Sequence, residues 1–298
     1  GGIENENIKA ITQLADNGYI VVGTFDSKVL TVGDKTLKNK GDTDSFIVKY
    51  RANGEVEYAI SLGEELNDTV VTLTDTSDGG YIVGGYFESQ KLKIDNYILE
   101  NSNYYNQYTD SFLIKFSKSG KIQWLNSFGG ERYDNIKSID ETADGDFMVA
   151  GWFESKEIKV DEYILKNKNE GNTDNFIIKF YANGKIKSAE TLGTKDTDAF
   201  RAISSTDGGY VTIGGGNIRK YASNNAIEWQ DNIGDTNGFR TILETGDGGY
   251  LVGGFIYGYI YIGGYELGYN PGSQGDNIGL IIKYDKNGNR TWGHLINS

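Results

Sequence analysis

Carboxylate residues recur at matching places along the chain, and such a set is a candidate site for a hard cation. The set comprises Glu6, Asp68, Asp134, Asp198 and, with an amide in place of the acid, Asn237. Ca²⁺ prefers several oxygen ligands, so the four acids would form a metal site if their carrier elements brought them together. The alternative is structural, with each carboxylate accepting backbone N–H bonds where the chain crosses between elements. Recurrence favours the structural interpretation, and we expect no cofactor, with Ca²⁺ as the one candidate.

Aromatic residues that break this regular pattern are candidates for ligand binding. Arg132 and Tyr133 stand beside Asp134 in one connection only, and Trp152 and Tyr86 end two corresponding strands. Other tyrosines gather in two inserts, Tyr104, Tyr105 and Tyr108 in one and Tyr257, Tyr259, Tyr261, Tyr265 and Tyr269 in the other. Tyr and Trp offer large amphipathic surfaces at a low entropic cost. Flanked by acids and amides, such surfaces suit sugar rings or peptides. The candidate ligand-binding set is Arg132, Tyr133, Asp134, Trp152, Tyr86, Tyr104, Tyr105 and Tyr108.

A third set of residues is expected to be structural. Lysines stand between apolar residues at one strand position, at Lys49, Lys115, Lys179, Lys220 and Lys283. Burying an unpaired ammonium is costly, so we expect each lysine to reach solvent or to pair with a carboxylate. The candidate partners open the same strands, at Asp44, Asp110 and Asp174. Aromatics at a second strand position are expected to pack in an outer core, at Tyr58, Trp124, Trp229 and Trp292.

Composition excludes several chemistries. The chain has no Cys and a single His, His294, which leaves no thiolate site and little scope for a Ser-His-Asp triad. A formal charge of −13 repels phosphate backbones, so nucleic acid is not an expected partner. No apolar run approaches the roughly 18 residues that a membrane span needs. The glycine-rich stretch at 76–87 lacks the Lys-Ser/Thr that follows the glycines of a phosphate loop.

That glycine-rich stretch, TSDGGYIVGGYF, is instead one copy of a repeat. Related segments begin at positions 14, 142, 205 and 244. Each copy is preceded by an apolar pair three residues apart and followed by two strand-like runs, as in FLIKF and KIQWLNSF. Asp-Gly and Asn-Gly between apolar runs are strong hairpin signals. Every repeat therefore holds four short antiparallel strands, which we number first to fourth along the chain.

Four antiparallel strands repeated five times are typical of a β-propeller. The sequence thus predicts an all-β fold, a five-bladed β-propeller of four-stranded antiparallel blades. Residues 1–298 would form one domain, with blades at about 1–63, 64–129, 130–193, 194–234 and 235–298. The rival is a β-solenoid, whose coils run parallel, and the hairpin turns inside each repeat argue against it.

Long segments join the second and third strands of four repeats. They cover about 26–45, 88–111, 154–175 and 257–277, whereas the fourth repeat has almost none. Alternating apolar residues around a turn, as in SKVLTVGDKTLKN, predict an extra hairpin in each, on one face of the propeller. Functional residues usually lie on loops held by a rigid scaffold, so we place ligand binding on this face. The alternative is that the hairpins only cover strand edges.

The repeat at 109–153, TDSFLIKFSKSGKIQWLNSFGGERYDNIKSIDETADGDFMVAGWF, resembles the bacterial propeller repeats of the SBBP type and, more distantly, the NHL type. The resemblance covers essentially the whole chain. It implies that the first strands line a central channel and the fourth strands lie outermost. Repeats of this type occur in diverse surface and extracellular proteins, so the resemblance implies a secreted or cell-surface protein. The sequence begins without Met, which is compatible with a preceding signal peptide.

We therefore expect a non-catalytic extracellular or cell-surface binding module, monomeric as a domain, that recognises a glycan or a surface protein. The first alternative is a glycoside hydrolase that uses carboxylates at the channel mouth, with Glu131 as an acid outside the regular set. Such enzymes need two carboxylates in dissimilar environments, whereas the recurring acids look equivalent. The second alternative is a structural spacer within a larger surface protein.

Overall fold

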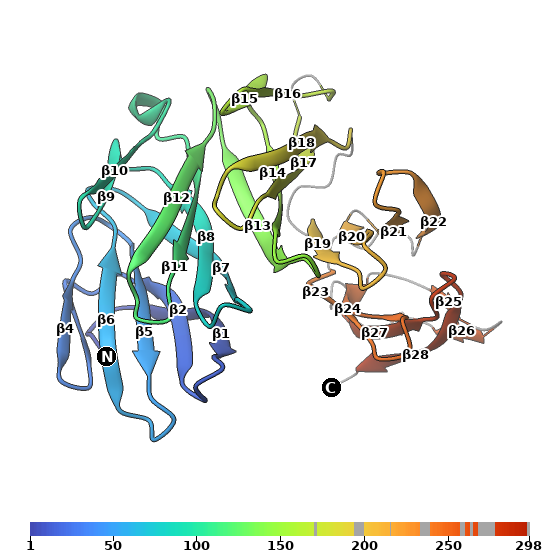
Figure 1. Cartoon of the computed structure of the whole chain (residues 1–298), viewed down its shortest axis with the longest axis horizontal. Coiled ribbons are helices and arrows are strands. Elements are labelled where there is room, and N and C mark those ends of the chain that lie inside the picture. Colours follow the sequence, from blue (N-terminus) through green and yellow to red (C-terminus); the bar gives the residue numbers. More distant parts are fainter. Residues whose placement is uncertain are drawn as a thin grey trace, which may run out of the picture. The chain divides into compact units, whose positions relative to one another are not determined.

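The computed structural model describes residues 1–169, 172–193, 200–214, 216–232, 239–256, 260–262, 265–267 and 278–296. Apart from the short 3₁₀ turn η1 (Tyr104–Asn106), all regular elements of this part are β-strands (Figure 1). The chain divides into two compact units. One unit comprises Gly1–Glu141 with Gly145–Gly193, and the other Thr142–Asp144 with Thr194–Ser298. None of the described residues belongs to a helix long and apolar enough to cross a membrane.

The first unit holds three four-stranded antiparallel sheets. The first sheet comprises β1 (Glu6–Gln13), β2 (Tyr19–Phe25), β5 (Asp44–Tyr50) and β6 (Val56–Leu62). The second comprises β7 (Asp68–Asp75), β8 (Tyr81–Phe87), β11 (Asp110–Phe116) and β12 (Ile122–Phe128). The third comprises β13 (Asp134–Glu141), β14 (Phe147–Phe153), β17 (Asp174–Phe180) and β18 (Ile186–Thr191). In each sheet every strand pairs with the next one of its repeat, which is the predicted meander.

The second unit holds two sheets of the same order. The fourth sheet comprises β19 (Arg201–Ser204), β20 (Tyr210–Gly214), β21 (Asn217–Tyr221) and β22 (Ile227–Asn232). The fifth comprises β23 (Thr241–Glu244), β24 (Tyr250–Ile256), β27 (Ile278–Tyr284) and β28 (Arg290–Ile296).

Short hairpins occupy four of the segments between second and third strands. They are β3 (Val29–Val32) with β4 (Lys35–Lys38), β9 (Lys91–Ile94) with β10 (Tyr97–Glu100), β15 (Glu157–Val160) with β16 (Tyr163–Lys166), and β25 (Ile260–Ile262) with β26 (Tyr265–Leu267). In the first unit β4, β10 and β16 contact the fourth strand of their own sheet, while β9 and β15 contact that of the preceding sheet. Each hairpin therefore covers part of a strand edge that would otherwise face solvent.

The tight turns between first and second strands follow from residues that tolerate a left-handed backbone. Asn17 (φ 61°) and Gly79 (φ 81°) take this conformation at the same place in the first and second repeats. The turns between third and fourth strands lie on the same side, because Lys49 of β5 donates from Nζ to the carbonyl of Lys118, 3.1 Å away. One side of these sheets therefore carries tight turns, and the longer connections leave from the opposite ends of the strands.

Neighbouring sheets of the first unit pack face to face, with the first strands β1, β7 and β13 in contact in succession. The apolar residues predicted three apart in β7 and β13 are the contact points, since Val70 and Ile136 are fully buried. Gly84 makes room for the third sheet. A Cβ there would lie 2.7 Å from Cδ1 of Ile139, closer than real Cβ atoms come.

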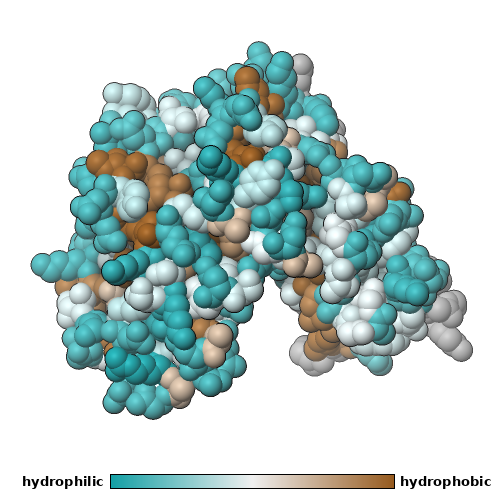
Figure 2. All heavy atoms as spheres, in the orientation of Figure 1, coloured by the Kyte–Doolittle hydropathy of each residue, from teal (hydrophilic) through white to brown (hydrophobic). Residues whose placement is uncertain are grey.

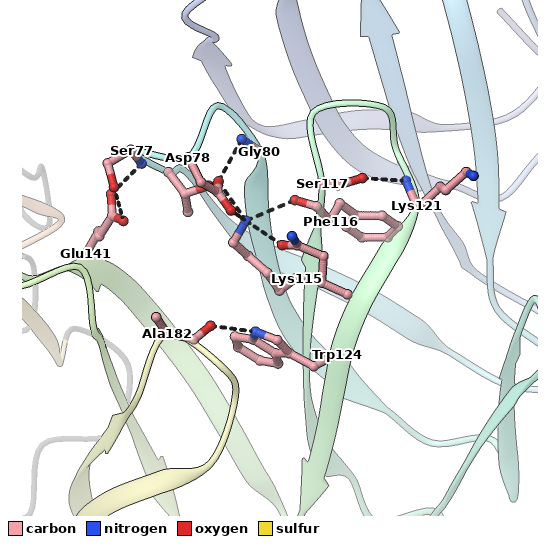
Figure 3. A network of polar contacts seen from close by, with 12 residues as sticks. Ser77, Asp78, Gly80, Lys115, Phe116, Ser117, Lys121, Trp124, Glu141 and Ala182 are labelled. Atoms are coloured by element: carbon pink, nitrogen blue, oxygen red, sulfur yellow. Dashed lines mark hydrogen bonds and ion pairs between the residues drawn. The ribbon is translucent and has the colours of Figure 1, made fainter.

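In the first, second, fourth and fifth sheets, a lysine near the end of the third strand pairs with an aspartate in the tight turn between the first and second strands. Lys115, almost fully buried, donates from Nζ to both carboxylate oxygens of Asp78 (3.0 and 2.9 Å) and to the carbonyl of Phe116 (Figure 3). The same ion pair joins Lys49 to Asp16, Lys220 to Asp207 and Lys283 to Asp247.

The expected pairing of these lysines is thus found, but the partners named from the sequence are wrong. Asp44 and Asp110 open the strands that carry Lys49 and Lys115, five residues away. Strand residues rise about 3.3 Å each, so those aspartates lie far from the ammonium group. The lysine stands next to the last residue of its strand, where the tight turn of the neighbouring hairpin begins.

Tyr58, Trp124 and Trp229 of the fourth strands pack against buried residues, as expected for an outer core, whereas the expectation is wrong for Trp292, which is 42% exposed. Trp124 stacks on Phe180 of the next sheet and donates from Nε1 to the carbonyl of Ala182, 3.0 Å away (Figure 3). Glu141 accepts hydrogen bonds from the backbone N–H and hydroxyl of Ser77, so it also joins the two sheets. Trp229 repeats the stacking and the backbone contact on Tyr284 and Lys286. Figure 2 shows mostly hydrophilic residues over the visible surface, in keeping with the high charge.

The ion pair between Lys115 and Asp78 is expected to stabilise the protein measurably. Asp78→Ala would leave a buried ammonium group with neutral acceptors only, so we expect urea denaturation to show a loss of about 2–3 kcal/mol in unfolding free energy. Asp34→Ala is the matched control, because Asp34 pairs with Lys35 at the surface, where solvent screens the pair, and we expect a smaller loss than in Asp78→Ala. Equal losses in the two variants would contradict this role.

Candidate functional site

The candidate site lies between the second and third sheets, on the side from which the long connections leave. There the segment after β10 meets the loop 129–133 between β12 and β13. The rings of Tyr108 and Tyr133 meet edge to face with centroids 4.9 Å apart, and Asn103 donates from Nδ2 to the carbonyl of Glu131. Two connections far apart in sequence therefore form one surface, which we call the tyrosine cluster (Tyr104, Tyr105, Tyr108, Arg132 and Tyr133).

The exposure of the tyrosine cluster suits contact with a ligand. The rings of Tyr104 and Tyr105 lie with centroids 4.0 Å apart, tilted by 33°, and Tyr105 is 82% exposed. Tyr133 is 37% exposed although its ring touches Tyr108. Paired rings lose little side-chain entropy when they bind, because each already restricts its neighbour.

A buried carboxylate holds the loop of Arg132 and Tyr133 in place. Asp134 accepts hydrogen bonds from the backbone N–H of Gly130 (2.7 Å) and from the N–H and hydroxyl of Ser155. The hydroxyl oxygen of Ser155 in turn accepts the N–H of Arg132, and Glu154 donates its N–H to the carbonyl of Tyr133. The loop backbone is therefore fixed at both ends by groups that are themselves buried.

Beside this loop lies a cavity of about 680 Å³ that we call the arginine cavity. It is lined by Glu131, Arg132, Glu154, Lys156, Glu157, Lys166 and Asn167. The lining carries three carboxylates, three cations and one amide, so it presents donors and acceptors of both signs to a polar ligand. Its volume is within the usual range for small-molecule pockets, but its walls are more polar than is typical of them.

The recurring acids make the hydrogen bonds that the structural interpretation predicts. Asp68 accepts from Glu64 N–H and from both the N–H and hydroxyl of Ser89, as Asp134 does in the next repeat. Glu6 accepts from the hydroxyl of Ser27 in the first repeat. Asp198 and Asn237 lie outside the described residues. Among the residues that the structure describes, no three acidic or histidine side chains are grouped so that they could hold a metal ion.

Burial changes the acid strength of these carboxyls. It raises the pKa of Asp68 to about 6 and that of Asp134 to about 8, although the hydrogen bonds from Ser89 and Ser155 favour the ionised forms. Burial also raises the pKa values of Asp44 and Asp110, at the starts of β5 and β11, to about 6. Asp68 and Asp134 accept hydrogen bonds on both carboxylate oxygens, so these two carboxyls have a structural role and no free face for a substrate.

The structure gathers some of the predicted ligand-binding residues and leaves others apart. The tyrosine cluster and Asp134 lie at one loop, whereas Tyr86 and Trp152 are half-buried inside β8 and β14. Trp152 carries the ammonium of Lys137 5.6 Å from its ring, and its buried Nε1 has no hydrogen-bond partner. The side chains of Tyr257, Tyr259, Tyr261, Tyr265 and Tyr269 lie outside the described residues.

Sequence reasoning missed most of the cavity lining and the serine partners. Glu154 and Lys156 precede the third hairpin and Lys166 ends it, in a segment whose pattern recurs in other repeats, so nothing singled them out. The serines were detectable, because Ser27, Ser89 and Ser155 follow the second strand at the same distance in three repeats. A hydroxyl that recurs in step with an acid is a sign that the two are hydrogen-bonded.

Comparisons with known proteins leave the family open. No family model matches the chain. A segment of 112 residues, 38% of the chain, is 30% identical to the regulatory protein FlaEY of Caulobacter vibrioides and spans 12% of its length. Similar solved structures include a protein of unknown function from Bacteroides caccae, with a TM-score of 0.49 and 10% identity over 98% of this chain and 82% of that one.

Two further solved structures have β-propeller-like folds. The Pan2 WD40 domain of Neurospora crassa has a TM-score of 0.49 and 12% identity, over 98% of this chain and 66% of that one. A virginiamycin B lyase from Staphylococcus aureus has a TM-score of 0.41 and 11% identity, over 99% and 96%. The resemblance to SBBP-type repeats stays a prediction.

The raised pKa values predict that stability falls as pH rises. Carboxyls of unfolded chains release their protons near pH 4, whereas Asp44, Asp68 and Asp110 keep theirs to about pH 6 and Asp134 to about pH 8. Between pH 4 and pH 8 the folded state therefore binds more protons, and the unfolding free energy falls with rising pH. We expect urea denaturation to show a loss on the order of a few kcal/mol between pH 5 and pH 8.

Asp134→Asn tests which group is responsible. The amide cannot ionise, so the variant should show a smaller difference between the two pH values than the original protein. Asp161→Asn, at an exposed turn, should leave the difference unchanged. Equal or greater stability at pH 8 in the original protein would refute the assignment.

Proposed function

We propose that this chain is a non-catalytic binding module that recognises a glycan or a protein through the tyrosine cluster and the arginine cavity. The observation that carries the proposal is the meeting of Tyr108 with Tyr133 beside a cavity whose lining includes Arg132. Aromatic faces next to charged and amide groups suit sugar rings and peptides alike. The resemblance to extracellular repeat proteins supports a secreted or cell-surface location.

A rigid loop supports recognition better than a mobile one. The backbone around Arg132 is held by Ser155 and Asp134, so these side chains need little ordering when a ligand arrives. The loop also departs from its counterparts in the other repeats, where no Arg-Tyr pair precedes the acid. A scaffold that repeats five times needs no such departure for its own stability.

The glycoside hydrolase alternative finds no support in the described residues. Asp68 and Asp134 are enclosed, and each accepts hydrogen bonds from the same kinds of donor. A general acid and its partner need different environments and access to the substrate. Glu131 is exposed at the arginine cavity, where it can contribute to binding.

We propose further that the repeats form a five-bladed β-propeller with hairpin inserts on one face. The support is the unequal burial of equivalent residues in the first unit. Ile8 and Ile11 of β1 are 71% and 65% exposed. Val70 and Ile136, the counterparts of Ile8, are fully buried, and Ile139, a counterpart of Ile11, is 5% exposed. In a closed propeller the fifth repeat would cover the exposed face of the first, and no strand exchange would be needed.

Ligand binding is expected to depend on the tyrosine cluster. Tyr133→Ala and Arg132→Ala should each weaken binding at least about tenfold, because aromatic and arginine anchors dominate binding energy. Binding should be measured first on a glycan array with and without EDTA, then against extracted surface proteins. Tyr181→Ala, at a tight turn on the opposite side, is the matched control and should bind normally. Binding that survives Tyr133→Ala and is lost in Tyr181→Ala would contradict the proposed site.

Closure of the propeller can be tested at Ile11. Ile11→Lys would place a charge in the junction, so we expect a loss of about 2 kcal/mol or more in unfolding free energy. Ile164→Lys on β16 is the control, because Ile164 is exposed on a hairpin and its change should cost below about 0.5 kcal/mol. Similar small effects in both variants would argue for an open arrangement.

A further inference from the structure

A second cavity, of about 420 Å³, lies where the third sheet's hairpin meets the end of the second sheet. It is lined by Ser102 after β10, by Asp110 at the start of β11, and by Ser127, Phe128 and Gly129 at the end of β12. The backbone of Gly129 pairs with Lys159 of β15, which closes the cavity on one side. We call it the aspartate cavity.

Asp110 has an unused acceptor in this cavity. The residue is only 2% exposed, and its Oδ2 accepts hydrogen bonds from the N–H and the hydroxyl of Ser102, both at 2.8 Å. Its Oδ1 is buried and has no hydrogen-bond partner. In the third sheet the equivalent oxygen, Oδ1 of Asp174, accepts the N–H of Gly193 at 2.8 Å. A buried carboxylate oxygen without a donor is costly, so this one invites a donor from outside.

The first and third repeats carry a different residue at the position of Ser102. Residues 38–40 and 166–168 both read Lys-Asn-Lys, whereas residues 100–102 read Glu-Asn-Ser. The three segments are structurally equivalent, because Lys40, Ser102 and Lys168 each donate their backbone N–H to Oδ2 of the aspartate that opens the third strand. Ser102 thus stands where the first and third repeats carry a lysine.

The lysine of the third repeat shows the path of the missing side chain. Lys168 extends to the end of the fourth strand and donates from Nζ to the carbonyl of Thr191, 2.8 Å away. Thr191 corresponds to Ser127, since each is the partner of the matching phenylalanine in the third strand. In the first repeat Lys40 donates from Nζ to Oε1 of Glu64, 2.8 Å away. Burial raises the pKa of Asp44 to about 6, and the charge of Lys40 opposes that rise. Ser102 is too short to follow this path, and the aspartate cavity lies along it.

We propose that the aspartate cavity binds the ammonium group of a lysine side chain supplied by a partner protein. The ammonium would donate to Oδ1 of Asp110 and to the chain end at Ser127, while its alkyl stem would lie against Phe128. Lysine suits this task because a flexible apolar stem carries its charge to a buried acceptor. An amine attached directly to a sugar ring lacks that reach.

The charge around the cavity agrees with a cationic ligand. Glu100 and Asp161 line it together with Asp110, against the single cation Lys159. The first and third repeats have Lys38 and Lys166 in the position of Glu100, so the change of charge is confined to the second repeat. This inference takes from the proposed function only that the partner is a protein. It uses none of the residues of the tyrosine cluster.

Binding of a minimal lysine probe to the full chain tests the proposal. The probe is Nα-acetyl-lysine methylamide, and the readouts are calorimetry and the amide NMR signals of Ser102, Ser127 and Gly129. We expect saturable shifts of these signals with the lysine probe. The norleucine analogue, which lacks the ammonium group, should cause none. Glucosamine should bind at least about tenfold more weakly than the lysine probe.

Two substitutions make the test specific without removing a buried group. Ser102→Lys restores the side chain of the other repeats, so it should raise thermal stability and weaken probe binding at least about tenfold. Lys40→Ser should open an equivalent place in the first sheet and add shifts near Gly63, because Oδ1 of Asp44 is also buried without a partner. Tyr133→Ala should leave probe binding unchanged, which separates this site from the proposed function.

The proposal fails on any of three results. One is the absence of shifts at every soluble concentration of the lysine probe. Another is equal binding of the norleucine analogue or tighter binding of glucosamine. The third is unchanged probe binding in Ser102→Lys. A loss of glycan or protein binding in Tyr133→Ala, with the lysine probe still bound, would leave the proposal intact.

Discussion

The chain crossing from one sheet to the next depends on a buried carboxylate. A four-stranded sheet cannot bury both faces alone, so each sheet must pack on a neighbour, and the chain must enter the next sheet through a closed interior. Asp68 and Asp134 stand at these entries and take up the N–H groups of the crossing loop and the hydroxyl of a serine. Burial raises the pKa of both carboxyls, and the hydrogen bonds from these donors oppose that rise. The position of loop 129–133, and with it the tyrosine cluster, follows from this contact.

The same contacts explain why the recurring acids are poor metal ligands. A cation needs oxygen atoms with free lone pairs, whereas Asp134 faces three donor groups that direct hydrogen atoms at it. A metal ion would have to displace Ser155, whose hydroxyl oxygen also accepts the N–H of Arg132. Acids that recur at equivalent positions of the repeats thus already use their oxygens in hydrogen bonds that stabilise the fold. Residues that differ between repeats, such as Arg132 and Ser102, have no such commitment.

The sequence predicts strands and turns well because both are local. Period-two patterns mark the strands, and Asp-Gly or Asn-Gly pairs mark the turns, so the meander of each sheet can be predicted from the sequence alone. The partner of Lys115 could not be predicted in this way. Asp78 lies in a turn of a neighbouring hairpin, and the choice between Asp78 and Asp110 depends on the direction of the strands. The contact of Tyr108 with Tyr133 depends on how one insert folds over the next sheet, which no local pattern encodes. The sequence shows that Ser102 replaces a lysine of the other repeats. The consequence of this replacement follows only from the contact that Lys168 makes in the structure.

A single strand separates the two candidate sites. Glu157 of β15 lines the arginine cavity, while Lys159, two residues further along the same strand, lines the aspartate cavity. Residues two apart in a strand point to the same side and lie about 7 Å apart, so an extended ligand that bound at both candidate sites would have to span about this distance. Such a ligand would be held by aromatic and polar contacts at one end and by a buried ion pair at the other. Two sites of different chemistry at a fixed distance select a ligand more sharply than either does alone, because a ligand that satisfies only one loses the gain from linkage.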